Sequence, residues 1–247
     1  MVCGRKRGHP RLRPTDHSLR IVMTTDNDRA SKFRGVDEPT LALIRISAAI
    51  AGSDEGTTRR VMENAVAIAD NSKVEEVILQ SYLFAGFPRA LNAARIWRSV
   101  SGAAAPADDP EARHANASQW EKRGEQTCET VYGESYEMLR RNIRELHPAL
   151  DAWMITDGYG KVLSRPGLDL KTRELCIVAA CAASGQQRQL HSHLHGALNA
   201  GASVREVETA LASLDDLVSS ENLDKYKSLL AHVTSRRHPP RESVDVR

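Results

Sequence analysis

The sequence is poor in aromatic residues, which make up only 4% of the chain, whereas alanine and leucine are abundant. Alanine and leucine favour helices, and β-rich folds are enriched instead in aromatic and β-branched residues. The formal net charge is only +2, so the chain lacks the concentrated basic field of a nucleic-acid-binding protein. We therefore expect a soluble all-α protein that does not bind nucleic acid.

Long apolar runs and paired cysteines are also lacking. No segment reaches the roughly 18 apolar residues that cross a bilayer, and the N-terminus has no apolar core of a secretory signal. Cys3, Cys128, Cys176 and Cys181 have no spacing typical of a zinc site or a disulfide framework. We expect a cytoplasmic protein with no membrane partner, whose thiols act mainly as small apolar groups.

Charge and apolar periodicity divide the chain into five segments. Residues 1–36 are basic and residues 236–247 polar, and neither segment has apolar periodicity, so both are predicted to be disordered tails. Residues 37–100 show helical periodicity and are expected to form three helices. Residues 101–118 are rich in alanine, proline and aspartate, as linkers are, and residues 119–235 form a second helical unit.

The two helical units resemble each other, which indicates a tandem repeat. Ser72 with Glu75, and Ser203 with Glu206, each place a serine three residues before a glutamate. This spacing predicts a capping box, in which each side chain accepts a hydrogen bond from a free backbone N–H of a new helix. The first unit has no histidine, so we interpret it as a partial copy.

Three of the nine histidines occur in QLHSHLHGALNAGAS. The stretch predicts a helix that ends at Gly201 in a left-handed conformation. On that helix His191 and His195 form an i,i+4 pair, while His193 lies apart from them at the edge of the apolar stripe. The pair has no intervening carboxylate of the HExxH kind and no evident third ligand, so no metal is expected.

Glu174 lies on a nearly apolar helix that is predicted to begin after an N-cap at Asp169. It shares a helical face with Ile177, Val178 and Cys181. A carboxylate on an apolar face needs a partner, and the imidazole of His193 would be able to share its proton. Pairing with Arg173 or a distant arginine, in a purely structural role, is the alternative.

These motifs resemble a known family. VLSRPGLDLKTREL, followed by QLHSHLHGALNAGAS and a helix containing Glu-Val, is similar to the carboxymuconolactone decarboxylase family, an all-helical group that includes the alkylhydroperoxidase D-like proteins. VYGESYEMLRRNIRELHPALDAWMITDGYG resembles the entry segment of that family, and VEEVILQSYLFAGFPRALNAARIW resembles the closing helices of another copy. The resemblance covers about residues 38–235 and implies two tandem all-α domains of this fold.

The peroxidase branch of the family has a glutamate, a CxxC pair and a histidine. Glu174 and His193 keep the family's separation of nineteen residues, but the cysteine positions are taken by Gln186 and Gln189. Cys176 and Cys181 lie five apart on a predicted helix, at an unsuitable angle for a disulfide. The resemblance therefore disfavours a thiol peroxidase.

The decarboxylase branch implies loss of CO2 from a small carboxylated lactone without a cofactor. By this resemblance His193 donates the proton and Glu174 sets its tautomer. The candidate substrate-binding residues are Arg173, Arg165 and Gln189. The two arginines are candidates because a guanidinium binds a carboxylate with two hydrogen bonds. Both arginines are equally compatible with a structural role. The chain has REL where decarboxylases have RSL, which leaves the lactone undefined.

Three functions remain open from the sequence. The first is decarboxylation or proton transfer on a small-molecule substrate, and the second is peroxiredoxin-like antioxidant activity through Cys128, Cys176 or Cys181. The third is a non-catalytic, oligomeric binding or scaffold protein. Single-copy relatives form helical rings, so two copies in one chain imply a homotrimer with pseudo-sixfold character, or a hexamer.

Overall fold

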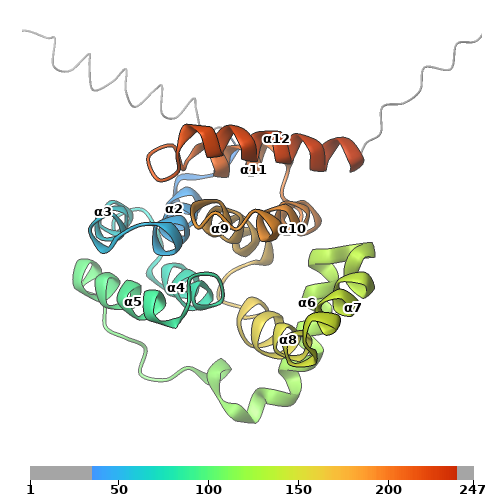
Figure 1. Cartoon of the computed structure of the whole chain (residues 1–247). Helices are drawn as coiled ribbons and strands as arrows, with labels where there is room; N and C mark the ends of the chain where they lie inside the picture. Colours follow the sequence, from blue (N-terminus) through green and yellow to red (C-terminus); the bar gives the residue numbers. More distant parts are fainter. Residues whose placement is uncertain (1–34, 238–247) are drawn as a thin grey trace, which may run out of the picture. The chain divides into compact units, whose positions relative to one another are not determined.

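The computed structural model describes residues 35–237, which fold into helices without any β-strand (Figure 1). This confirms the all-α prediction. The predicted tails, residues 1–36 and 236–247, lie outside the described residues except at their inner edges. None of the described helices is both long and apolar enough to cross a membrane.

The first helical segment contains α2 (Glu38–Gly52), α3 (Glu55–Ala65), α4 (Asn71–Ala85) and α5 (Phe87–Ser101). The expectation of three helices was wrong, because a fourth helix, α5, follows α4 after Gly86, which has a φ of 84°. This left-handed region of backbone space favours glycine, and Pro88 in the first turn then suits the start of α5.

The two predicted capping boxes have different outcomes. At α11 (Val204–Ala212) the Ser203 hydroxyl accepts a hydrogen bond from the Glu206 backbone, and the Glu206 side chain accepts one from the Ser203 backbone, as predicted. At α4 the prediction was wrong, because Asp70 is the N-cap and accepts from the backbone of Ser72. Glu75 instead accepts hydrogen bonds from Asn71 and Arg98. A carboxylate placed just before the helix replaces the serine as the cap.

Residues 101–118, predicted to be a linker, contain the short 3₁₀-helices η1 (Pro110–Ala112) and η2 (His114–Asn116) and the start of the next helix. The elements that follow are α6 (Ala117–Tyr132), η3 (Gly133–Ser135), α7 (Tyr136–Leu146), α8 (Pro148–Trp153) and η4 (Met154–Leu163). η4 is a π-helix, a rare conformation that often occurs near functional sites.

Glycines allow α6 and η4 to pack with their backbones in contact. A Cβ at Gly124 would lie 2.1 Å from the Ile155 carbonyl oxygen, and one at Gly160 would lie 1.9 Å from the Trp120 carbonyl oxygen. Neither position has room for a side chain. This close packing fixes one wall of the cavity described below.

The last helical segment contains α9 (Leu170–Ala183), α10 (Gln187–Asn199), α11 (Val204–Ala212) and α12 (Ser220–Arg237). Asp169 caps α9 as predicted, accepting from the Thr172 backbone at 3.0 Å. Gly201 ends α10 as predicted, with a φ of 95°. The Ala202 N–H donates to the Ala197 carbonyl, which completes a Schellman motif.

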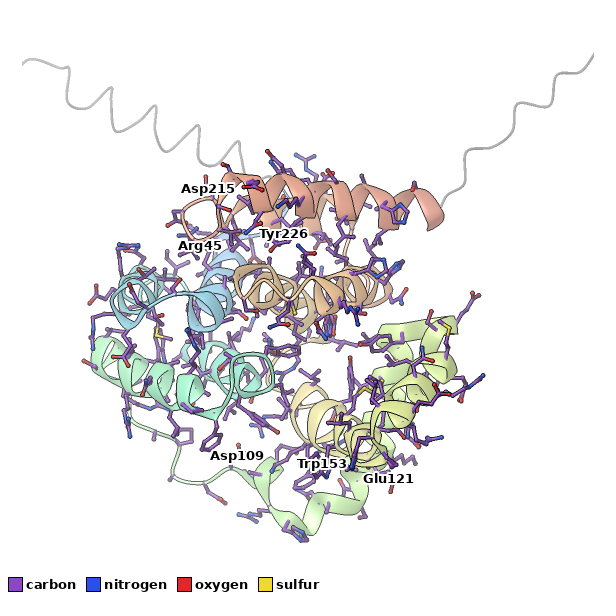
Figure 2. The ribbon with its side chains drawn as sticks, viewed as in Figure 1. Arg45, Asp109, Glu121, Trp153, Asp215 and Tyr226 are labelled. Carbon is purple, nitrogen blue, oxygen red and sulfur yellow. The ribbon has the colours of Figure 1, made fainter. Side chains whose placement is uncertain are left out.

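The two helical segments share one hydrophobic core. Helix α2 packs against α9, and α4 packs against both. Ser47 donates to the Cys176 carbonyl at 2.8 Å, which joins α2 to α9 in the core. Tyr226, labelled on α12 in Figure 2, donates to the Ala182 carbonyl of α9. Whether the segments are tandem copies stays a prediction, but neither has a core of its own.

Candidate functional site

Glu174 and His193 meet in the core between α9 and α10. Glu174 Oε2 lies 2.8 Å from His193 Nδ1. The glutamate is 0% exposed and the histidine 5% exposed. The sequence predicted that these two groups face each other, and the structure brings them together.

Gly196, one turn after His193 on α10, makes room for this contact. A Cβ at this position would lie 2.5 Å from Glu174 Oε2 and 2.7 Å from Val131 Cγ1. The glycine therefore lets the carboxylate lie directly against the helix that carries the histidine. No part in the site was predicted for Gly196 from the sequence.

The other oxygen of the glutamate has no hydrogen-bond partner. Glu174 Oε1 is buried, and no donor lies within reach of it among residues 35–237. Buried carboxylate oxygens usually have partners, since leaving one without a partner is costly. The pair is thus less completely satisfied than a purely structural ion pair would be.

His193 lines a cavity of about 570 Å³. The apolar and aromatic part of the lining comes from α4, α6, α7, α8 and η4, and its members are Tyr82, Leu83, Phe84, Tyr132, Leu139, Ile143, Leu150, Trp153, Met154, Tyr159 and Leu163. Phe84 contacts the imidazole edge-on, with ring centroids 5.5 Å apart. Because Nδ1 bonds to Glu174, Nε2 is the ring nitrogen left for a ligand.

Gln189, predicted as a substrate-binding residue, lines the same cavity one helical turn before His193. Arg188, Ser192 and Asp157 are its other polar lining residues. Trp153, labelled in Figure 2, lines the cavity and is 60% exposed, so this part of the lining lies at the protein surface. A ligand thus has a route to the buried histidine.

The two arginines predicted to bind a substrate carboxylate lie outside this cavity. Arg173 is 0% exposed and donates to Glu76 at 2.7 Å and to Gln80 at 3.2 Å. Arg165 donates to the same Glu76 at 2.8 Å and to Asp109 at 2.9 Å. Their donors are occupied by the protein, so the expected role in the His193 site is not met. The contacts of both arginines fit the alternative prediction, which is a structural role.

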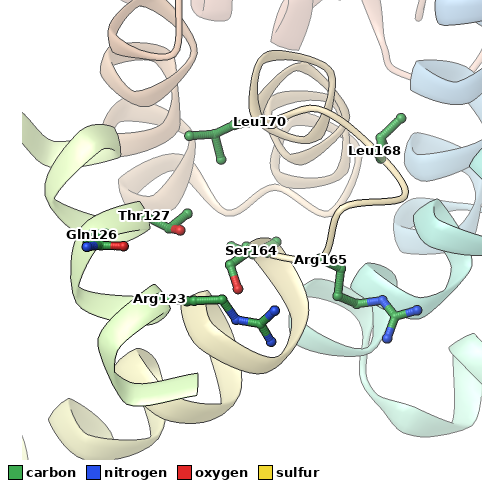
Figure 3. A pocket seen from close by; sticks show the side chains of 8 residues that line it. Arg123, Gln126, Thr127, Ser164, Arg165, Leu168 and Leu170 are labelled. Atoms are coloured by element: carbon green, nitrogen blue, oxygen red, sulfur yellow. The ribbon is translucent and has the colours of Figure 1, made fainter. Parts of the chain in front are cut away.

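Arg165 borders a second, smaller cavity of about 280 Å³. Figure 3 shows Arg165 pointing away from Arg123, toward the neighbouring helices, with Ser164 between the two arginines. The remaining side chains there are Gln126, Thr127, Leu163, Leu168 and Leu170. This cavity contains neither His193 nor Glu174.

The described thiols are buried and not paired with one another. Burial raises the pKa of Cys128 to about 12 and, together with the charge of Glu174, raises that of Cys181 to about 12. Burial also raises the pKa of Cys176. Thiolates are the reactive form, so these cysteines are poor nucleophiles at neutral pH.

His191 and His195 lie close to each other on α10, with ring centroids 5.1 Å apart. In the part of the chain that the structure describes, no group of three histidine, cysteine, aspartate or glutamate side chains is arranged to hold a metal ion. Neither histidine belongs to the cavity of His193.

Sequence comparison defines the class of protein to which this helical fold and its buried acid–imidazole pair belong. A family model described as the carboxymuconolactone decarboxylase family matches residues 149–225, a range that includes both Glu174 and His193. The chain belongs to this family. It is also similar to Peroxisomal protein 2 of Schizosaccharomyces pombe, with 31% identity over 194 residues that cover 75% of this chain and 89% of that protein.

Proposed function

We propose that this protein is a cofactor-independent enzyme that transfers a proton on a small carboxylated, lactone-type substrate, with decarboxylation as the overall reaction. The observation that supports the proposal most strongly is the 2.8 Å contact of His193 with Glu174 beside an open apolar cavity. Family membership supports the same class of chemistry.

The contact determines what each group does. Glu174 accepts a hydrogen bond from Nδ1–H, which fixes the orientation of the ring. The protonated ring then holds its second proton on Nε2, facing the cavity. When the C–C bond to the carboxylate breaks, CO2 leaves and the electron pair stays on the substrate. That carbanion takes the Nε2 proton, and the neutral imidazole regains a proton from solvent.

The apolar lining supports this reaction in a second way. A carboxylate loses favourable hydration when it enters an apolar cavity, whereas CO2, the leaving product, is neutral. The cavity therefore favours the product side of the step. Gln189 at the cavity wall is a candidate hydrogen-bond donor to the substrate.

A decarboxylation assay on carboxymuconolactone tests the proposal. We expect His193→Ala to lower kcat/KM by about 10²- to 10⁴-fold, the usual contribution of a general acid or base. His191→Ala is the matched control, because that side chain is on the same helix but outside the cavity. Unchanged turnover in His193→Ala, or no turnover in the wild type, would contradict the proposal.

The peroxiredoxin-like alternative has little support in the site, because the described thiols are buried and their pKa values raised. A peroxide-consumption assay on a cysteine-free variant separates the two. Consumption that persists without cysteine would eliminate thiol chemistry. The scaffold alternative is favoured if neither reaction proceeds.

We also propose a homo-oligomer, a homotrimer with pseudo-sixfold character or a hexamer. Helix α7 contributes no buried residue, and Leu146 at its end is 74% exposed. Exposed apolar side chains of this kind favour coverage by another chain. A stable monomer in light scattering would count against the assembly.

For location we propose the cytoplasm, on the basis of composition and unpaired thiols. The name of the yeast relative supports the peroxisome as the alternative for this chain. Imaging of the full chain fused to a fluorescent protein at either end distinguishes the two compartments.

A further inference from the structure

The charges around the His193 cavity are few and separated. Apart from the histidine, Arg188 of α10 and Asp157 of η4 are the only charged side chains that residues 35–237 contribute to the lining. Asp157 accepts a hydrogen bond from Thr156, and its charge adds to burial in raising the pKa of Tyr82. The negative charge therefore acts on the Tyr82 side of the cavity.

Arg188 differs from Arg165 and Arg173 in being free to bind a ligand. Within residues 35–237 it takes part in no ion pair, and its side chain is exposed at the first turn of α10. A guanidinium without a carboxylate partner in a ligand cavity is suited to bind an anion with two hydrogen bonds. The N-terminal end of α10 adds a positive dipole on the same side.

Helical geometry relates Arg188 to the reactive histidine. The two residues are five positions apart, which corresponds to about 7.5 Å along the helix axis. Arg188 is exposed and His193 is buried, so the arginine lies at the mouth of the cavity and the histidine inside it. Between them the wall is formed by Gln189 and Ser192.

We infer that the cavity binds amphipathic acids, with a recognition carboxylate on Arg188 and a predominantly apolar body along Leu139, Ile143 and Met154. The reacting group of such a ligand lies inside, at His193. The inference rests on the proposed function only where it says that the ligand reacts at His193. The binding of the ligand does not depend on that reaction. It assigns the anion-binding role to Arg188 in place of Arg165 and Arg173, and it predicts that an apolar portion of the ligand adds to its affinity.

Binding of three simple ligands, measured by isothermal titration calorimetry without any turnover, tests the inference. Decanoate has both features, decan-1-ol lacks the charge and butanoate lacks most of the apolar body. We expect decanoate to bind about tenfold more tightly than decan-1-ol, the gain from one charge-assisted interaction at an exposed site. Butanoate should bind more than about a hundredfold more weakly than decanoate, because most of the apolar burial is lost.

Variants then identify the group that recognises the charge. Arg188→Gln should bind decanoate and decan-1-ol equally, and Asp157→Asn should tighten decanoate binding alone by a few-fold. Arg60→Gln, an exposed arginine on α3, is the matched control and should keep the wild-type preference. Circular dichroism confirms that each variant is folded.

Several outcomes would overturn the inference. These are a wild type that binds no decanoate, an Arg188→Gln variant that keeps the preference for the acid, or butanoate binding as tightly as decanoate. The proposed function fails separately, because it depends on turnover by His193→Ala and not on these affinities. Loss of the acid preference in Arg188→Gln together with unchanged turnover in His193→Ala would retain this inference and reject the reaction.

Discussion

Arg173 and Glu174 are neighbours on α9, and both are 0% exposed, yet their surroundings differ. Arg173 donates to Glu76, Gln80 and two backbone carbonyls. Glu174 has one oxygen bonded to His193 and the other without a partner among the described residues. The histidine opens onto a cavity, whereas the arginine is surrounded by protein. A fully paired buried charge joins helices, and a partly paired one beside a cavity is available for chemistry.

Arg173 and Glu174 each act on a cysteine of α9. The largest effect that we expect concerns the reactivity of these thiols. Cys176 is influenced by the charge of Arg173 and Cys181 by that of Glu174. The pKa of Cys181 rises from 9.0 to about 12, mainly through burial. In a Cys3→Ser background, iodoacetamide should therefore label Cys181 about a thousandfold more slowly in the folded protein than in denaturant.

Mass spectrometry of the labelled peptides measures this rate for each thiol separately. Cys128, on α6, has a pKa raised to about 12, mainly by burial and less by the charges of Glu174 and Asp151, and is the comparison thiol from another helix. Rapid labelling of Cys181 with slow labelling of Cys128 would show that the Glu174 side of α9 is open to thiol chemistry after all.

The Arg173 side is tested by Glu76→Gln. Burial alone would raise the pKa of Glu76, but hydrogen bonds from Arg165 and Arg173 outweigh it, and the net pKa is lowered below 4.5. We expect a loss of about 3–5 kcal/mol in the free energy of unfolding at pH 7, because the change leaves a buried guanidinium without its carboxylate.

The pH dependence of that loss follows from the sign of the shift. A carboxylate with a lowered pKa stabilises the fold fully above its unfolded pKa, and this stabilisation disappears as the pH falls through the folded pKa. The difference between wild type and Glu76→Gln should therefore shrink below about pH 4.5. Urea unfolding at several pH values measures it, with Glu63→Gln on the exposed side of α3 as control. A constant difference would contradict the ion-pair explanation.

The Glu174 side is tested by Gly196→Ala. The new methyl group would lie 2.5 Å from Glu174 Oε2, so the carboxylate or the helix must move. We expect a loss of about 1–3 kcal/mol in stability, together with weaker coupling of the glutamate to His193. Gly56→Ala on α3 has its nearest neighbour at 3.6 Å and should be neutral or slightly stabilising. Thermal unfolding of both variants makes the comparison.

Local sequence signals predicted the fold where the physical cause is local. Helical periodicity, the Asp169 cap, the Gly201 terminus and the Ser203 capping box all depend on residues close in the chain, and the structure confirms them. The third predicted helix ended at Gly86, and α5, which follows it, was missed. Ser72 was misassigned because Asp70 competes for the same backbone donors.

The candidate site was harder to predict than the helices, because its residues are far apart in the sequence. Glu174 and His193 are 19 residues apart on consecutive helices, so spacing and family resemblance together were sufficient to pair them. The partner of Arg173 is 97 residues away, and no pattern around the arginine indicates it. The cavity wall from α7, α8 and η4, and the position of Arg188 at its mouth, depend on how the helices pack.

The salt bridge from Glu76 to Arg173 also sets a limit on how this chain can be divided. Residues 149–225, the range that family comparison recognises, contain the arginine but not the glutamate that neutralises it. In a fragment that begins after η2, the Arg173 guanidinium would lack the Glu76 carboxylate. It would then have to be hydrated or buried as an unpaired charge. We therefore expect the smallest autonomous folding unit to be larger than residues 149–225, so expression trials or domain grafts should keep α2 to α5 attached.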